Sequence, residues 1–129
     1  IIFLLNNKMA YDKNNIFAKI LRGEIPCKKI YENDFVLSFH DINPQKKIHA
    51  LVIPKGEYID LDDFLQNAKE KEITEFFKAI NQVAKILKIS NLDGGYRTLS
   101  NISVNGGQEV PHLHFHLFGG EKIGKMVSN

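Results

Sequence analysis

Residues 111–118, which read PHLHFHLF, constrain the fold of this chain more than any other stretch. Successive side chains of a β-strand point to opposite faces, so His112, His114 and His116 are predicted to share one face. The apolar residues between them would share the other face. Imidazole has an ordinary pKa of about 6.5, so it can act near neutral pH as nucleophile, acid, base or metal ligand. The stretch therefore predicts a strand that carries a row of reactive histidines.

The composition is that of one ordinary globular domain. The chain has 129 residues, of which 43% are hydrophobic and 25% are charged. Its net charge of +2 comes from interspersed lysines and acidic residues, so no nucleic-acid partner is expected. No stretch approaches transmembrane length, and no membrane partner is expected. The chain has one cysteine, Cys27, which cannot form an internal disulfide, so we expect a cytoplasmic location.

The chain divides into a leader, a domain and a tail. Residues 1–14 are predicted to be a poorly ordered leader, 15–120 a single domain, and 121–129 a C-terminal tail. Asn15 is a candidate N-cap for a short amphipathic helix that ends before Gly23. Three strands are predicted next, over 29–32, 35–40 and 49–53.

A long helix occupies the middle of the sequence. Asn67 and Glu70 resemble a capping box, and apolar residues recur at helical spacing from Ile73 to Leu87. The remaining elements are predicted over 60–65 (one or two helical turns), 96–100 (a fourth strand) and 101–109 (a loop). The histidine strand is then the fifth. The order of elements predicts an α+β domain with a five-stranded antiparallel sheet, one short helix and one long helix.

The loop before the histidines contains the residue types of a phosphate site. Glycines such as Gly107 let backbone N–H groups approach an anion, and Asn101 and Gln108 offer neutral hydrogen bonds. A hairpin turn uses the same residue types, so the loop alone leaves both interpretations open. If phosphate binds beside the row, a neutral imidazole can attack phosphorus. A protonated imidazole can stabilise the oxyanions or protonate the leaving group.

Residues 112–118 resemble the histidine-triad signature, His-φ-His-φ-His-φ-φ with φ apolar, of the HIT superfamily of nucleotide hydrolases and transferases. Other segments look like its Hint branch, the nucleoside phosphoramidases: IFAKI at 16–20, GEIP at 23–26, FHDINP at 39–44, HALVIPK at 49–55, GQEV at 107–110 and GG at 119–120. The resemblance covers about residues 15–120. It implies a HIT-like fold.

The resemblance implies a two-step hydrolysis of the P–N bond in purine nucleoside 5′-phosphoramidates. His114 would attack phosphorus, expel an amine and form a covalent nucleotidyl-histidine, which water then hydrolyses. His112 and His116 would orient the nucleophile and hold phosphate oxygens, and His49 would support the proton transfers. The implied ligand is a purine nucleoside monophosphate, its phosphoramidate or its ester, and neither a cofactor nor a catalytic metal is expected.

Nucleotide contacts are implied in the same way. Asp41 would bind the ribose hydroxyls. The phosphate contacts would be Asn101, Gly107 and the backbone of Gln108, Glu109 and Val110. The purine slot would be lined by Ile16, Phe17, Ile20, Ile25, Phe39 and Ile42. The residues themselves leave other roles open, because Asp41 can also cap a turn, and Ile20 and Phe39 are equally typical of a core.

Glu109 departs from the pattern of some family members, which carry a serine that assists the departing amine. Other members carry glutamate at this position. We expect only the backbone N–H of Glu109 to be needed, for binding phosphate. The leaving group, the proton donor and the preference between adenine and guanine stay open.

Three other functions are compatible with the sequence. A zinc hydrolase is one, because His-x-His on a strand with His49 suits zinc, but no carboxylate ligand is obvious in register with the row. We therefore expect zinc only as an adventitious ion. The second is hydrolysis of dinucleoside polyphosphates, or nucleotidyl transfer, within the same superfamily. The third is a nucleotide-binding scaffold with incidental catalysis.

A homodimer is also predicted. Relatives that resemble this chain pair their long helix and one strand across a two-fold axis. A five-stranded sheet has edges to protect, and the phenylalanine-rich helix carries more apolar surface than a small monomer needs.

Overall fold

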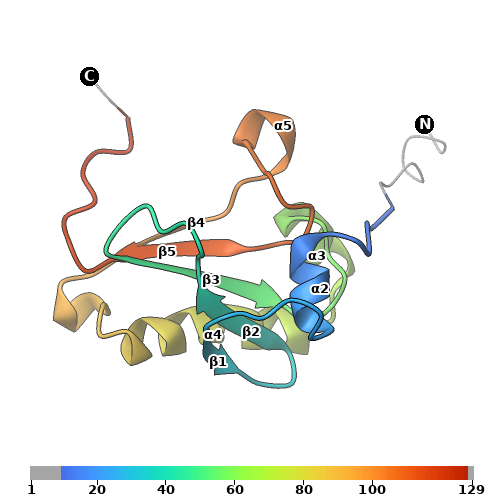
Figure 1. Ribbon diagram of the computed structural model, residues 1–129, viewed down its shortest axis with the longest axis horizontal. Helices are drawn as coiled ribbons and strands as arrows, with labels where there is room; N and C mark the ends of the chain where they lie inside the picture. The colour runs from blue at the N-terminus through green and yellow to red at the C-terminus, as the bar shows by residue number, and fades with distance from the viewer. Residues whose placement is uncertain (1–9, 128–129) are drawn as a thin grey trace.

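A five-stranded antiparallel sheet forms the centre of the computed structural model, which describes residues 10–127 (Figure 1). The strands are β1 (Lys29–Glu32), β2 (Val36–His40), β3 (Ile48–Pro54), β4 (Arg97–Leu99) and β5 (Phe115–Gly119). They lie in the order β1-β2-β3-β5-β4. The predicted α+β class and the antiparallel sheet are confirmed. Residues 1–9 of the predicted leader and 128–129 of the tail lie outside the described residues.

One helix precedes the first strand, and further helices and short helical turns connect later strands. They are α2 (Ile16–Leu21), α3 (Leu61–Asn67), α4 (Glu70–Ile86), a 3₁₀ turn (Asn91–Asp93) and α5 (Ser103–Gly106). The predicted N-cap of the short helix is confirmed, because the Asn15 side chain accepts a hydrogen bond from the Ala18 N–H over 2.9 Å. The four-residue α5 lies within the predicted loop. No helix in residues 10–127 is both long enough and apolar enough to cross a membrane.

The predicted capping box at Asn67 and Glu70 is wrong. Asn67 is the last residue of α3, and its amide donates to the Asp63 carboxylate and carbonyl oxygen instead of capping the next helix. Helix α4 begins at Glu70, and the Glu72 carboxylate accepts the N–H of Lys69 over 3.2 Å. Asn67 therefore ends a separate helix, α3, and does not start α4.

The two faces of the sheet carry different apolar clusters. Helix α4 covers one face, where Phe76, Ile80 and Val83 pack with Val52 and Leu117 (Figure 1). Phe17 of α2 packs on the opposite face against Leu37, Phe39, Leu51 and Ile53. Strand β3 contributes to both clusters, which explains why it is a continuous apolar run. The second face is also the face that carries the histidines.

The histidine strand begins later than predicted. Strand β5 starts at Phe115, whose partner in β3 is Val52. Before that point the His112 ring lies 2.9 Å from the Pro54 carbonyl oxygen, and the Leu113 N–H donates to Tyr58. These contacts replace strand pairing, so residues 111–114 approach the sheet without joining its ladder. The side of the chain facing α4 stays apolar as predicted, with Leu113 fully buried.

Candidate active site

The structure brings together all four histidines that the sequence singled out. His49 lies on β3 and His116 on β5, while His112 and His114 lie just before β5. The ring centroids of His114 and His116 are 5.0 Å apart, and those of His49 and His116 are 5.2 Å apart. His112, His114 and His49 are buried. The site is therefore a packed row of imidazoles and not a solvated sheet edge.

The hydrogen bond of His114 determines which of its nitrogens is free. Its Nδ1 lies 2.8 Å from the carbonyl oxygen of His112, and a carbonyl can only accept, so the ring hydrogen is on Nδ1. The lone pair is then on Nε2. Burial lowers the pKa of His114, although the His112 carbonyl and the carboxylates of Asp41 and Glu109 act in the opposite direction. His114 thus presents a neutral, unprotonated Nε2, which is the form of imidazole that acts as a nucleophile.

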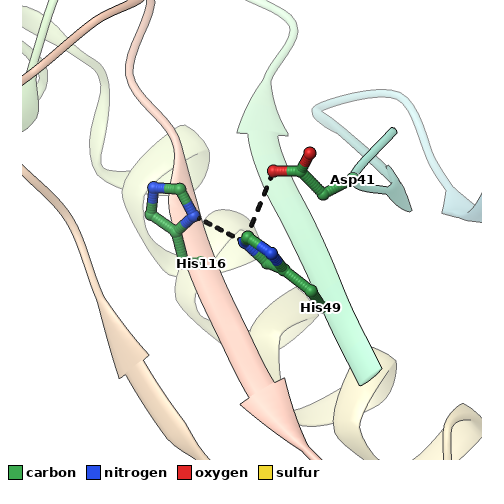
Figure 2. Close-up of side chains that lie close together, drawn as sticks. All are labelled: Asp41, His49 and His116. Atoms are coloured by element: carbon green, nitrogen blue, oxygen red, sulfur yellow. Dashed lines mark hydrogen bonds and ion pairs between the residues drawn. The ribbon is translucent and has the colours of Figure 1, made fainter. Parts of the chain in front are cut away.

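His49 is hydrogen-bonded to His116 and lies beside the Asp41 carboxylate (Figure 2). The Gln45 backbone N–H donates to His49 Nδ1 over 3.0 Å, so the hydrogen of a neutral His49 is on Nε2. That Nε2 lies 2.9 Å from His116 Nδ1 and 3.4 Å from the Asp41 carboxylate. His116 therefore accepts at Nδ1 and carries its own hydrogen on Nε2. Burial lowers the pKa of both rings, that of His116 to about 4.

Asp41 has two contacts in this arrangement. One carboxylate oxygen faces His49, and the other accepts the Asn43 N–H over 2.8 Å, as in an Asx turn. The turn-capping role that the sequence left open is thus present. The ribose contact stays a prediction.

Asp41, His49 and His116 could also hold a metal ion, because their ligand atoms all lie within 4.8 Å of one another. A metal at His49 Nε2 would require the ring hydrogen to move to Nδ1, where the Gln45 N–H already donates. Metal binding would therefore break that hydrogen bond. The three side chains therefore suit the observed hydrogen bonds of His49 better than they suit a metal ion.

The loop of the predicted phosphate site is braced by the Gln108 side chain. Its amide oxygen accepts the Ser103 N–H, and its amide nitrogen donates to the carbonyls of Ile59 and Val110 over 2.6 and 3.0 Å. Within residues 10–127, the backbone N–H groups of Glu109 and Val110 have no protein acceptor, so both can donate to a ligand. Gly107 and Glu109 are exposed, and Asn101 is half-buried.

The predicted purine slot is only partly assembled around the row. Phe17 lies edge-on to His114, with ring centroids 5.0 Å apart. Phe39 is buried behind Phe17 and belongs to the core cluster of the second face. Ile20 and Ile25 are half-buried, whereas Ile16 and Ile42 are exposed. The slot as a whole stays a prediction, and Phe17 is the member in contact with the histidines.

Three contacts at the site were not found from the sequence. The ring of Phe118 stacks on His116 with an interplanar angle of 4°, and strand alternation could have indicated it. The Gln45 contact involves only the backbone, so its side chain gives no signal. The Tyr11 hydroxyl lies 2.6 Å from His112 Nδ1. Tyr11 falls within the predicted leader, where residues 10–14 are described and make specific contacts.

A buried row of neutral histidines on one face of a five-stranded antiparallel sheet defines the class of protein. The model of the HIT domain matches residues 22–123. The chain therefore belongs to the HIT family, as the resemblance implied.

Individual relatives cover nearly all of the chain. It is 53% identical over 119 residues to a HIT-like protein of Azospirillum brasilense, spanning 92% of this chain and 96% of the relative. It is 36% identical over 118 residues to the purine nucleoside phosphoramidase of Escherichia coli K12, spanning 91% and 96%. The structure of a histidine triad protein from Clostridium difficile superposes with a TM-score of 0.78 at 38% identity, covering 92% of this chain and all of that one.

Proposed function

We propose that this protein hydrolyses the P–N bond of purine nucleoside 5′-phosphoramidates through a covalent nucleotidyl-histidine at His114. HIT family membership supports a hydrolase or transferase that acts on nucleotides. The similarity to the Escherichia coli phosphoramidase supports the narrower activity. The observation that carries the proposal is the bond from His114 Nδ1 to the His112 carbonyl oxygen, because it leaves Nε2 as an unprotonated nucleophile.

The first step forms a bond from His114 Nε2 to phosphorus and breaks the P–N bond of the substrate. The amine leaves with a proton from solvent, and the positive charge on the modified ring is stabilised by the Nδ1–H bond to the His112 carbonyl oxygen. The His116 Nε2–H and the N–H groups of Glu109 and Val110 are the donors for phosphate oxygens. Their hydrogen bonds would strengthen as charge develops on those oxygens.

The second step restores the free enzyme. Water attacks phosphorus, the bond to Nε2 breaks, and the electron pair returns to His114 while the water proton passes to solvent. The products are the amine and a nucleoside monophosphate. His49, bonded to His116 and facing Asp41, holds the donor in place during both steps.

The proposal is tested by hydrolysis of adenosine 5′-phosphoramidate, with and without EDTA. We expect turnover by the parent that EDTA leaves unchanged and that His114→Ala abolishes. His40→Ala is the matched control, because His40 is an exposed histidine at the end of β2. Loss of turnover in EDTA and its recovery with zinc would favour a metal hydrolase instead. Faster cleavage of a dinucleoside polyphosphate would assign the second superfamily activity, and tight AMP binding without turnover would favour a scaffold.

A cytoplasmic location is part of the proposal. Cys27 is exposed and unpaired, and a thiol in that state persists most readily in a reducing compartment. Fractionation of cells that express the full chain tests this location.

A further inference from the structure

Tyr11 contacts the histidine that precedes the nucleophile. Its hydroxyl oxygen lies 2.6 Å from His112 Nδ1, and the two rings meet edge-on with centroids 5.6 Å apart. Tyr11 is half-buried and His112 is fully buried. The contact joins residues that are 101 positions apart in the chain, and Tyr11 lies before the part that the HIT domain model matches.

The segment that carries Tyr11 is fastened to the start of α2. The Asp12 carbonyl oxygen accepts the Asn15 side-chain amide over 2.7 Å, and Asn15 in turn caps the helix. The Arg22 guanidinium donates to the Lys13 carbonyl over 2.8 Å. These bonds hold the two backbone residues that directly follow Tyr11, so the position of the Tyr11 ring follows from the placement of α2.

The direction of the Tyr11 bond follows from the other nitrogen of His112. His112 Nε2 lies 2.9 Å from the Pro54 carbonyl oxygen, which can only accept, so the ring hydrogen is on Nε2. The lone pair on Nδ1 must then accept from the Tyr11 hydroxyl. Burial raises the pKa of Tyr11 and lowers that of His112 to about 4, so the hydroxyl keeps its proton and the imidazole stays neutral.

His112 connects this bond to the nucleophile. With both ring nitrogens held, the His112 ring has one tautomer and one orientation. The carbonyl oxygen of His112 accepts the Nδ1–H of His114, and this bond leaves Nε2 of His114 unprotonated. Phe17 packs edge-on against both rings, with centroids 6.3 Å from His112 and 5.0 Å from His114. A rotation of the His112 ring would therefore disturb the residue whose carbonyl oxygen accepts the Nδ1 hydrogen of His114.

We propose that Tyr11 is a positioning residue for the nucleophile. Its hydroxyl donates to His112 Nδ1 and holds the orientation of a ring whose tautomer the Pro54 carbonyl oxygen sets, and His112 then presents its carbonyl oxygen to His114. The catalytic consequence rests on the proposed function, whereas the tautomers of both rings do not depend on it.

The test compares Tyr11→Phe, which removes only the hydroxyl, with Tyr31→Phe. Tyr31 is the matched control, because its hydroxyl bonds to Asn33 over 3.2 Å on the β1–β2 hairpin. In ¹⁵N NMR spectra of the imidazoles, we expect His112 to be Nε2–H in all three proteins, because the Pro54 carbonyl oxygen accepts that hydrogen in each. The Nδ1 resonance of His112 should move downfield in Tyr11→Phe alone, because that nitrogen loses its hydrogen bond. With adenosine 5′-phosphoramidate, Tyr11→Phe should lower kcat about three- to tenfold, the range for one buried hydrogen bond, with KM changed by less than about twofold.

Each of the following outcomes would contradict either this proposal or the proposed function. An unchanged His112 Nδ1 resonance in Tyr11→Phe would overturn the proposal, whatever the rate. A shifted resonance with an unchanged kcat would overturn the positioning role. Absence of turnover in the parent would contradict the proposed function, while the NMR spectra would still decide whether Tyr11 fixes His112.

Discussion

The backbone N–H of Gln45 donates to Nδ1 of His49 over 3.0 Å, and this bond fixes the direction of the next one. With its hydrogen on Nε2, His49 donates to His116 Nδ1 over 2.9 Å. His116 must then carry its hydrogen on Nε2, where it is free to meet a phosphate oxygen. A main-chain amide in the turn between β2 and β3 thus sets the state of a ring on β5.

Substitution of His49 tests this arrangement. His49→Ala removes the donor to His116, and we expect kcat to fall about ten- to hundredfold, the loss typical of a hydrogen bond that supports a charged state. His49→Gln retains an amide donor and should be less impaired. Steady-state kinetics with circular dichroism as a folding check gives both values. Equal kcat for the parent and a folded His49→Ala protein would contradict the arrangement.

Acid should destabilise the folded protein. The pKa of His112 and of His116 is lowered to about 4 by burial, below the ordinary value of 6.5. Between these values the unfolded chain binds protons that the folded chain does not. Stability is therefore full above about pH 6.5 and falls as the pH drops towards about 4, by up to about 1.4 kcal/mol per pH unit for each group.

Urea unfolding at about pH 7 and about pH 5 measures this loss. A folded His112→Asn protein should show a smaller dependence on pH, whereas His40→Ala should resemble the parent. Equal unfolding midpoints for the parent at the two pH values would show that the buried histidines are not held neutral.

Removal of the Glu109 carboxylate should leave turnover nearly intact. The side chain is exposed, and its charge acts on His114 by raising the pKa, so Glu109→Ala should lower the His114 pKa and keep the nucleophile neutral. The backbone N–H that is proposed to bind phosphate is unchanged. We expect kcat within about threefold of the parent. Loss of turnover with unchanged AMP affinity would instead make the carboxylate a proton donor.

A dimer is expected in solution. Phe77 and Ile86 on α4 are 38% and 50% exposed, and β4 is an edge strand of the sheet. Light scattering at micromolar concentration should give twice the mass of the chain, and Ile86→Glu should shift it towards the monomer. Val104→Glu is the control, because Val104 is 89% exposed on α5, which lies away from α4 (Figure 1). A parent protein with the mass of one chain would refute the dimer.

Periodicity and turn chemistry were enough to predict the sheet. The alternation around His114 placed Leu113 and Leu117 against the core beneath α4, since a strand can bury only one set of its side chains there. The same alternation predicted the face that His116 shares with the row. The start of β5 was missed because His112 bonds through its ring to a backbone carbonyl, and such a bond leaves no pattern in the sequence.

The contacts that support the histidines were harder to predict from the sequence than the histidines themselves. Gln45 acts through its backbone N–H, which every residue except proline possesses. Tyr11 lies in a short polar stretch without periodicity, and its partner is 101 residues away. The Tyr11 contact depends on the three-dimensional approach of distant segments. The sequence indicated the reactive groups, and the structure was needed to determine their tautomers.

The most direct test of nucleophilic catalysis by His114 is the stereochemical course of hydrolysis at phosphorus. The substrate would be an adenosine 5′-phosphorothioamidate of known configuration, cleaved in ¹⁸O-labelled water, with the product configuration then determined. Two in-line displacements, one by His114 and one by water, predict retention of configuration. Inversion would mean that water attacks the substrate directly, and the covalent mechanism would then be wrong.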